Sequence, residues 1–413
     1  MPISRPLLPN GAIRISGGRI AQVGRWRDLR AEFPKEPAID AGDAALLPGL
    51  VNSHCHLDYT HMAGQLPPPK AFTDWLKLIT TTKGGWDLSE YAASWRAGAA
   101  MLLRTGTTTV GDIEAVPQLL AEMWKATPLR VISFLEMIGI TGRRPPHALL
   151  QETLEMSARL RSNRCRIGLS PHAPYSTVPE LLRLSGQAAG KRGWGLCIHL
   201  AESAVEFHMF ARAEGEMYDW LKRSGRDMAD CGSGSPAQHL ERYGVLGPNL
   251  LAAHANYLGP GDAALLARRG VSVVHCPRSH SYFRHGPFAV RKLLRAGVNV
   301  CLGTDSLATV YQARRQPPVE LNLFEEMRAL ARREPGLSPR RVLRMATLSG
   351  ARALGLQGKI GELAPGAFAD VIAVPLEGKE SAAHGVVLEH KGQVLMSMIG
   401  GKRVYPAAGT EAS

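Results

Sequence analysis

The middle of the chain alternates eight apolar runs with stretches of helical character, and this alternation limits the fold more than any other feature. The runs are nearly continuous in apolar residues, like the strands of a parallel sheet covered on both faces. Stretches with helical spacing lie between them, for example 89–106, 178–193 and 262–270. We therefore predict an α/β fold, a (β/α)8 barrel. Its expected strands are 46–54, 107–113, 130–137, 165–170, 195–200, 250–254, 271–276 and 299–303.

Both ends of the chain have a different, β-rich pattern with glycine punctuation. Residues 12–24 contain two short strand-like runs joined by Gly17 and Gly18, which is typical of a hairpin. Further β-rich segments are 369–376, 385–390 and 393–405. Since an isolated hairpin is marginally stable in water, we expect the two ends to pair with each other. The predicted domains are a composite β-sandwich from 1–50 and 356–413, and a barrel from 51–355.

Composition favours a cytoplasmic protein with a large core. The 413 residues are 45% hydrophobic, and the six cysteines, which form no CxxC motif, argue against a disulfide scaffold. We expect no secretory signal and no membrane contact, because no run approaches the roughly 18 apolar residues of a membrane span. The net charge of +13 comes from dispersed arginines, and aromatic residues are only 6%, so a nucleic-acid partner is not expected. A positive field could still steer an anionic substrate.

Several predicted strands end in histidine or aspartate, and this pattern points to a metal site. His54 and His56 end the first run one residue apart, so their side chains share one face of a strand and Cys55 points the other way. His199 ends the fifth strand and Asp305 follows the eighth. Such barrels carry their active sites at the carboxyl ends of the strands. We predict that these three histidines and Asp305 bind one divalent ion, with zinc preferred and ferrous iron also compatible.

Three groups at the same strand ends are candidates for proton transfer. Glu202 lies three residues after His199 and could carry a proton beside the metal. His254 ends the sixth strand and could orient a water molecule or polarise a carbonyl-like centre. Asp305 could also accept the proton of a metal-activated water. The simpler alternatives are an exposed loop acid for Glu202 and a core histidine for His254.

Four further residues are candidate substrate contacts. His172 ends the fourth strand between two prolines, and Trp75 follows the first strand, where its indole could cover a flat ring. His280 lies past the seventh strand, and Arg143 follows the third, where it could meet an anionic group. A structural loop histidine, a helix-packing tryptophan and a surface arginine remain the alternatives. Residues 204–249 exceed an ordinary loop and are a candidate lid or pocket wall.

The order of these motifs resembles the amidohydrolase superfamily, specifically its cytosine deaminase and chlorohydrolase-like branch. The resemblance covers nearly the whole chain and rests on GGRIAQVG, LLPGLVNSHCH, GTTTVGD, PHAPYS, HLAES, AHANYL, CPRSH, LGTDSLA, ATLSGARALGL and GKIGELAPGAFADVIAV. It implies a metal-bearing barrel with a β-sandwich from both termini. It also implies metal ligation by the residues named above, acid/base and water-positioning roles for Glu202 and His254, and a homodimer.

Two segments depart from the usual pattern of this branch. CPRSH has His280 where the branch usually has asparagine, and HCHLDYTHMAG together with FTDWL differs from the commonest deaminases. The combination is most similar to deaminases of adenine-bearing nucleoside-like compounds, such as those similar to aminodeoxyfutalosine deaminase.

Residues and resemblance together predict metal-dependent hydrolytic deamination of a small aromatic N-heterocycle, of purine or adenosine type, with release of ammonia. No lysine ends the fourth strand, so a carboxylated lysine between two metals is not expected and one metal is preferred. One alternative is hydrolysis of a cyclic amide or a ring C–Cl bond in the same site. The other is a catalytically inactive scaffold, which typically loses metal ligands, whereas all four candidate ligands are present here.

Overall fold

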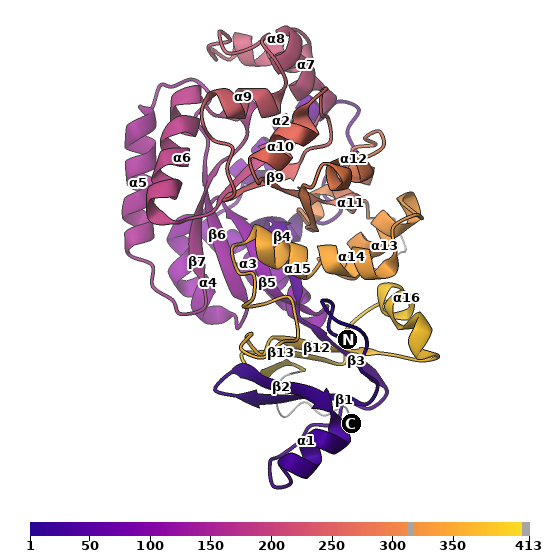
Figure 1. The fold of residues 1–413 in the computed structure, drawn as a ribbon. Coiled ribbons are helices and arrows are strands. Elements are labelled where there is room, and N and C mark those ends of the chain that lie inside the picture. Colours follow the sequence, from indigo (N-terminus) through magenta and orange to yellow (C-terminus); the bar gives the residue numbers. More distant parts are fainter. Residues whose placement is uncertain (313–316, 407–413) are drawn as a thin grey trace.

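Eight parallel strands form one sheet that closes into a barrel (Figure 1). The computed structural model describes residues 1–312 and 317–406. Neighbouring barrel strands follow one another in sequence, in the order β4 (Leu50–Cys55), β5 (Thr107–Glu114), β6 (Arg130–Met137), β7 (Arg166–Pro171), β8 (Leu196–Leu200), β9 (Leu250–His254), β10 (Ser272–His275) and β11 (Asn299–Leu302). The backbone N–H of His56 donates to the carbonyl oxygen of Asp305 at 3.2 Å, which joins the first strand to the last. The predicted barrel is confirmed.

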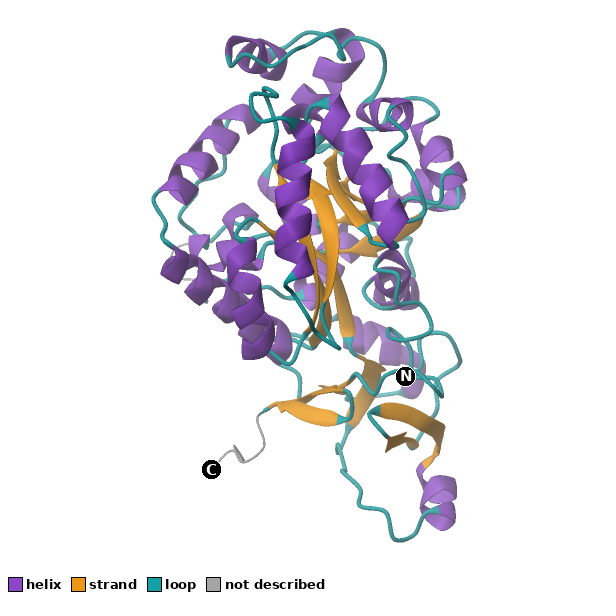
Figure 2. Cartoon of the chain, turned by 90° about the vertical axis from the view of Figure 1, so that its left-hand side faces the viewer, coloured by secondary structure: helices purple, strands orange, loops and turns teal. Residues whose placement is uncertain are grey.

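Helices surround the barrel strands (Figure 2). They are η1 (Leu57–Met62), α2 (Phe72–Gly84), α3 (Leu88–Arg104), η2 (Pro117–Leu119), α4 (Leu120–Ala126), α5 (Pro146–Ala158), η3 (Pro174–Ser176), α6 (Pro179–Arg192), α10 (Asp262–Arg268), α11 (Pro277–Tyr282), α12 (Val290–Arg295), η4 (Leu307–Thr309), α13 (Leu323–Arg333), α14 (Pro339–Met345) and α15 (Leu348–Ala353). A capping box of Asp87 and Glu90 begins α3, and its buried Trp95 and Leu102 pack against the barrel core. Within the described residues no helix is both long and apolar enough to cross a membrane.

Two small antiparallel sheets lie beneath the barrel and combine both ends of the chain (Figure 1). One is the hairpin of β1 (Gly11–Ser16) and β2 (Arg19–Arg25), which α1 (Trp26–Glu32) follows. The other joins β3 (Ala44–Pro48) to β12 (Val371–Pro375), β13 (Met396–Ile399) and β14 (Lys402–Tyr405). Leu47 pairs with Ile372 in this sheet, so the expected pairing of the two ends is confirmed. The domain boundaries at 50/51 and 355/356 stay a proposal.

The predicted strand 46–54 was wrong, because this segment forms two strands of different sheets. The chain turns at Gly49, whose N–H donates to the carbonyl oxygen of Asp370 at 2.9 Å. A Cβ atom at this position would lie 2.1 Å from Oγ1 of Thr108, so only glycine lets the backbone pass so close to β5. The sequence does not reveal this break, because the strands on both sides of Gly49 are largely buried and therefore equally apolar.

The predicted strand 385–390 was also wrong, because the segment forms helix α16 (Ala383–Leu388), which follows η5 (Glu380–Ala382). Its buried residues are Ala383, Val387 and Leu388, which lie on one face of a helix. Val387 and Leu388 pack into the large apolar core beside α14. A short apolar run is compatible with a strand and with one or two helical turns. Here the core surface beside α14, against which the run packs, determines that the segment is helical.

Residues 204–249 form α7 (Ala204–Arg212), α8 (Glu216–Arg223) and α9 (Pro236–Arg242), at the end of the barrel away from the small sheets (Figure 1). A buried ion pair holds the segment together, since Nη1 and Nη2 of Arg226 lie 2.7 and 2.8 Å from the two carboxylate oxygens of Asp230. Nε of Arg226 also donates to the carbonyl oxygen of Tyr175 at 3.1 Å. The segment is thereby fixed to the loop after β7, and its role as a lid or pocket wall stays a prediction.

Candidate metal and catalytic site

The end of β4 directs two imidazoles to one point in the barrel mouth. Nε2 of His54 and Nε2 of His56 each lie 3.7 Å from Oδ1 of Asp305. Cys55 belongs instead to the core cluster of Trp95 on the outer side of the sheet. The strand alternation expected from the sequence therefore places both histidines together.

A third histidine approaches this pair from β8. Nε2 of His199 lies 3.3 Å from Nε2 of His56. Nδ1 of His199 lies 2.9 Å from the carbonyl oxygen of His172. Because a carbonyl only accepts, Nδ1 carries the proton and Nε2 keeps its lone pair for a ligand. Such a hydrogen bond to the second ring nitrogen is a recurrent feature of metal-binding histidines.

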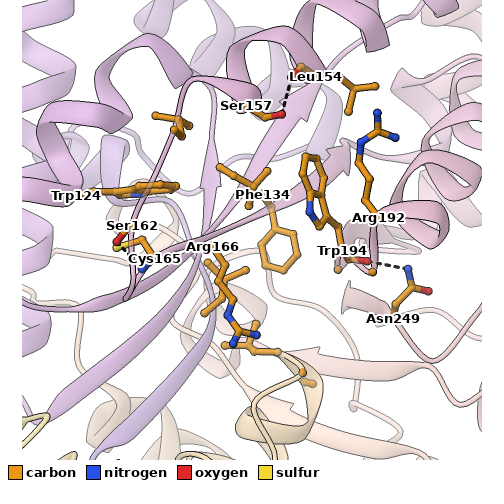
Figure 3. Close-up of a pocket in the computed structure, with 18 of the residues that line it drawn as sticks. Trp124, Phe134, Leu154, Ser157, Ser162, Cys165, Arg166, Arg192, Trp194 and Asn249 are labelled. Atoms are coloured by element: carbon orange, nitrogen blue, oxygen red, sulfur yellow. Dashed lines mark hydrogen bonds between the residues drawn. The ribbon is translucent and has the colours of Figure 1, made fainter. Parts of the chain in front are cut away.

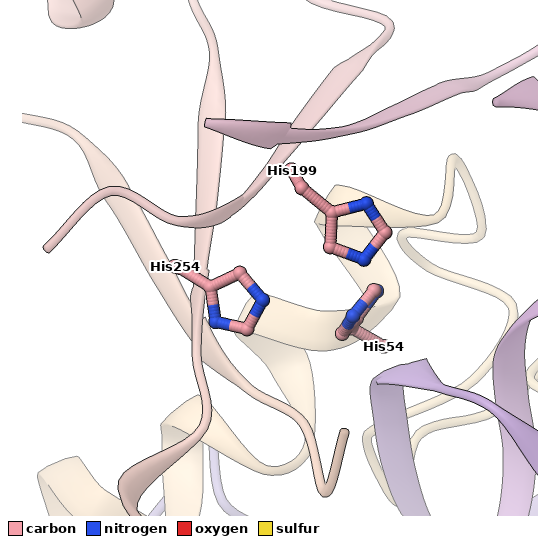
Figure 4. Close-up of side chains that lie close together, drawn as sticks. All are labelled: His54, His199 and His254. Atoms are coloured by element: carbon pink, nitrogen blue, oxygen red, sulfur yellow. The ribbon is translucent and has the colours of Figure 1, made fainter. Parts of the chain in front are cut away.

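Potential ligand atoms lie within 4.8 Å of one another in three overlapping groups, namely His54, His199 and His254; His54, His56 and Asp305; and Glu202, His254 and Asp305. Figure 4 shows the rings of the first group turned toward one another. Nε2 of His54 and Nε2 of His254 are buried without a hydrogen-bond partner in the protein. A buried unpaired nitrogen costs free energy unless something binds it. Orphaned imidazole nitrogens beside one carboxylate fit a divalent ion such as zinc.

The imidazoles of His56, His199 and His254 are neutral near pH 7, the form that binds a metal. Burial lowers the pKa of His56 and of His254 well below the usual range. Burial and the neighbouring His172 lower the pKa of His199 to about 3. Neutral rings can offer lone pairs to a cation at any pH near 7.

Asp305 is the carboxylate of the cluster and stays ionised. Burial alone would raise its pKa, but His54, His254 and His56 hold the pKa of this carboxyl well below its usual value. Its Oδ2 lies 3.0 Å from the hydroxyl of Thr309. Oδ1 of Asp305 thus faces the histidines, and the hydroxyl of Thr309 holds Oδ2 in place.

Glu202 follows β8 and faces His254, with 3.7 Å between Oε1 and Nε2. Burial, with the nearby charges of Asp305 and Glu206, raises the pKa of Glu202 well above its usual value. A carboxyl that is protonated near neutral pH can act as a general acid. Glu206 holds the loop, since its two carboxylate oxygens accept from the backbone N–H groups of Ala201 and Glu202 at 3.0 and 2.8 Å.

The backbone is strained where the strands meet this cluster. His254, Asp305 and Ala201 have φ values of 71°, 54° and 48°, in the left-handed region that side chains with a Cβ rarely adopt. Such residues cost on the order of 1–3 kcal/mol each and occur mostly at functional sites. Gly303 allows β11 to approach β4, because a Cβ there would lie 2.7 Å from the carbonyl oxygen of His54.

Among the predicted substrate contacts, His172 lies beside the cluster. Its ring centroid is 4.6 Å from that of His199, and its Nδ1 lies 2.6 Å from the hydroxyl of Ser176. Its Nε2, 3.9 Å from Oε1 of Glu136, faces the barrel mouth. A substrate contact by this nitrogen stays a prediction.

The other three predicted contacts lie in different surroundings. The indole of Trp75, in α2, is buried against Phe72 and Phe283, with ring centroids 6.1 and 5.1 Å away. His280 already has protein partners on both ring nitrogens, Oδ1 of Asn256 at 3.0 Å and the carbonyl oxygen of Gly286 at 2.7 Å. Arg143 is exposed on the loop after β6. Contact with substrate by these residues remains a prediction that no distance here tests.

Sequence reasoning missed a group of buried acids next to the histidines. Asp58 has both carboxylate oxygens buried without a hydrogen-bond partner, and burial with the nearby Glu114 raises its pKa well above the usual value. Glu136 lies 4.0 Å from Nζ of Lys83, which sits 4.8 Å over the ring of Tyr59. The available signal was the placement of acidic residues inside otherwise apolar strands, as at Asp112 and Glu114 of β5.

Comparison with known proteins places this geometry in a family. The sequence profile of the Amidohydrolase family matches residues 45–404. The chain belongs to the amidohydrolase family. A second profile, the imidazolonepropionase-like composite domain of bacteria, matches residues 11–35. This amidohydrolase is 35% identical over 378 residues to a 5-methylthioadenosine/S-adenosylhomocysteine deaminase of Syntrophobacter fumaroxidans, an alignment that covers 88% of this chain and 80% of the relative.

Further relatives of this amidohydrolase have related names. An aminodeoxyfutalosine deaminase of Deinococcus radiodurans is 30% identical, over 84% of this chain and 81% of its own. The structure of a Xanthomonas campestris adenosine deaminase with bound zinc superimposes with a TM-score of 0.83 at 27% identity, covering 98% of this chain and 90% of that one. The zinc-complexed atrazine chlorohydrolase of Arthrobacter aurescens superimposes with a TM-score of 0.81 at 22% identity, over 96% and 90% of the two chains. This last likeness speaks for the fold alone.

Proposed function

We propose that this amidohydrolase hydrolytically deaminates an adenosine-like compound and releases ammonia. The observation that carries the proposal is the convergence of buried, neutral imidazoles on one carboxylate, with Glu202 beside them. Such an arrangement brings a metal-binding group and an acid/base pair to one barrel mouth. The named deaminases that share about a third of its sequence, among them the one at 35% identity, support the adenosine class of substrate.

The proposed metal ligands are His54, His56, His199 and Asp305, with zinc preferred to ferrous iron. A divalent ion bound there would act as a Lewis acid and make a water molecule acidic enough to react near neutral pH. The zinc of the similar Xanthomonas campestris deaminase supports this preference. The buried Nε2 of His254 lies outside this ligand set and is free for the substrate or the water.

Glu202, His254 and Asp305 would each transfer one proton or stabilise one developing charge. Glu202, whose pKa is raised by burial, gives its proton to the ring nitrogen next to the carbon that bears the exocyclic amine. This makes that carbon open to attack by water. Nε2 of His254 lies on the same side of the pocket as Oε1 of Glu202, 3.7 Å away, and stabilises the incoming oxygen.

Asp305 completes the proton transfers. As an ionised carboxylate it accepts the proton of the attacking water and passes it to the departing amine, which leaves as ammonia. One C–O bond forms and one C–N bond breaks, the remaining proton of the attacking water returns to Glu202, and the product is the corresponding oxo-heterocycle. His172 is proposed to contact the heterocycle through Nε2. We also propose Trp75, His280 and Arg143 as substrate contacts. Trp75 packs against aromatic rings, both ring nitrogens of His280 have protein partners, and Arg143 is exposed.

Ammonia release from metal-loaded protein tests the proposal across adenosine, 5′-deoxy-5′-methylthioadenosine, adenine, cytosine and a chlorotriazine. We expect ammonia from the adenosine derivatives, and its loss in Asp305→Asn. Chloride release from the triazine without ammonia from any nucleoside would instead select the ring C–Cl alternative. Loss of the metal without loss of any activity would contradict both. A homodimer and a cytoplasmic location stay predictions, which size-exclusion chromatography with light scattering and cell fractionation would test.

A further inference from the structure

We propose a second ligand site, at the end of the barrel opposite the histidine cluster, for a small aromatic anion such as a nucleoside phosphate. A hollow of about 700 Å³ opens there among the amino-terminal ends of β6, β7, β8 and β9 and the end of α15 (Figure 3). This volume lies in the range of small-molecule sites. The metal cluster lies at the carboxyl ends of the strands, so the hollow is separate from the site of the proposed deamination.

Aromatic side chains form the walls of this hollow. Trp124 and Trp194 stand on opposite sides of Phe134 in Figure 3. Two glycines make room for the phenyl ring, because a Cβ at Gly168 or Gly195 would lie 2.4 or 3.2 Å from Phe134 ring atoms. Phe134 and Trp124 are only 2% and 5% exposed and form the buried back of the hollow, so the half-buried Trp194 at its rim is the aromatic face on which a planar ring can stack.

Positive charge surrounds the aromatic walls and nothing in the lining neutralises it. The lining includes Arg161, Arg166, Arg192 and Arg352 and contains no aspartate or glutamate. Within residues 1–312 and 317–406, the side chains of Arg166 and Arg352 have no hydrogen bond or ion pair to the protein. Arg161 donates only to the carbonyl oxygens of Ala158 and Leu160, at 2.6 and 2.8 Å. These guanidinium groups are available to an anion from outside.

Two largely buried arginines elsewhere in the protein are neutralised by carboxylates. Arg130 pairs with Asp370 at 2.5 Å between the barrel and the small sheets, and Arg278 pairs with Glu326 at 2.5 Å. The arginines of the hollow have no such carboxylate beside them, and they create a positive potential that attracts anions. Guanidinium groups bind phosphate and carboxylate oxygens in pairs of charge-assisted hydrogen bonds.

The two features together select the ligand class. Inorganic phosphate would use the arginines and leave the face of Trp194 bare. A neutral nucleoside would stack and leave the guanidinium groups unpaired. A nucleoside phosphate would use both the arginines and the aromatic face. At one wall the guanidinium of Arg192 lies 5.6 Å from the ring centroid of Trp194, so a positive charge and a stacking surface lie side by side.

Isothermal titration with uridine 5′-monophosphate tests the proposal, because uracil carries no exocyclic amine for the proposed deamination to remove. We expect a Kd below roughly 1 mM, and at least tenfold weaker binding in the double variant Arg166→Gln/Arg352→Gln. Uridine alone and inorganic phosphate alone should each bind at least tenfold more weakly than the nucleotide. The matched control is Arg295→Gln, on the exposed face of α12, which should leave the affinity unchanged.

A second variant keeps the test decisive if the arginine variant is unstable. Trp194→Leu should weaken the nucleotide at least tenfold and leave the weak binding of inorganic phosphate unchanged, with thermal unfolding reporting the fold of each variant. The proposal is overturned by the absence of heat at millimolar nucleotide, by equal affinity in the double variant, or by equally tight binding of phosphate alone. Binding of a poly-glutamate peptide but not of the nucleotide would also overturn it.

Discussion

The hydroxyl of Thr309 lies 3.0 Å from Oδ2 of Asp305, on the side of the carboxylate that faces away from the histidines. Thr309 is itself buried, so water cannot take its place. The hydrogen bond fixes the direction of Oδ1 toward His54 and His56. Thr309 is therefore a positioning residue for the proposed metal ligand and proton carrier.

Thr309→Val should lower kcat about tenfold, the equivalent of ~1.4 kcal/mol, while KM changes little. The substitution keeps the shape and removes the hydrogen bond, so Asp305 is less well aligned. Steady-state kinetics with metal analysis would check this. Thr309→Ser, which keeps the hydroxyl, should restore most of kcat, and a serine variant as slow as the valine variant would contradict a role for the hydroxyl.

Glu202→Gln should abolish turnover by a factor of about 10²–10⁴ and leave the metal content unchanged. The amide has the shape of the buried acid but cannot deliver its proton to the ring nitrogen. Stopped assays of ammonia formation and metal analysis measure the two effects separately. Glu214→Gln, an exposed glutamate on the same segment, is the matched control and should keep full activity. Full turnover by the Glu202 variant would exclude it as the general acid.

Removal of the metal by a chelator should stop ammonia release and lower the melting temperature. The buried Nε2 atom of His54 then lacks any partner, and the folded state loses the free energy of metal binding, about 2.7 kcal/mol at a metal concentration 100 times Kd. Differential scanning calorimetry with and without chelator tests this, and added zinc should restore both properties. The melting temperature of Asp305→Asn should respond much less to the chelator.

Asp230→Asn should reduce the free energy of unfolding by about 3–5 kcal/mol at pH 7, because Arg226 is left buried without its counter-ion. Although burial would raise it, Arg226 holds the pKa of Asp230 below its ordinary value of 3.8. The carboxylate therefore stabilises the fold at any pH above that value, and this contribution is lost as the pH falls below it. Urea unfolding should show a constant difference from pH 8 to pH 5 that shrinks below about pH 4.

The barrel and the metal cluster were predictable because local patterns determine them. Apolar runs at strand length end in His54, His199 and Asp305, and the barrel topology brings strand ends together without knowledge of any other contact. The hairpin at Gly17 and Gly18 is similarly local, since both residues have positive φ as a tight turn requires.

The parts that could not be predicted depend on partners distant in sequence. Gly49 divides one apolar run into strands of two sheets because Thr108 lies against it. The segment at 385–390 is helical because Val387 finds a core surface next to α14. Asp58 was not recognised as a neighbour of the cluster, since its position follows from how η1 packs against α3 and β5 rather than from a motif.

The barrel closes where its first strand meets its last, and the ends of these two strands supply His54, His56 and Asp305, three of the four proposed metal ligands. Asn52 and Thr304, 252 residues apart in the chain, donate to each other at 2.8 and 3.1 Å just below that site. A ribosome-bound chain therefore holds His54 and His56 long before Asp305 is synthesised. Because Asp305 belongs to the last strand end, a chain that stops before it would lack the complete set of proposed ligands, and we expect it neither to bind the metal nor to be active.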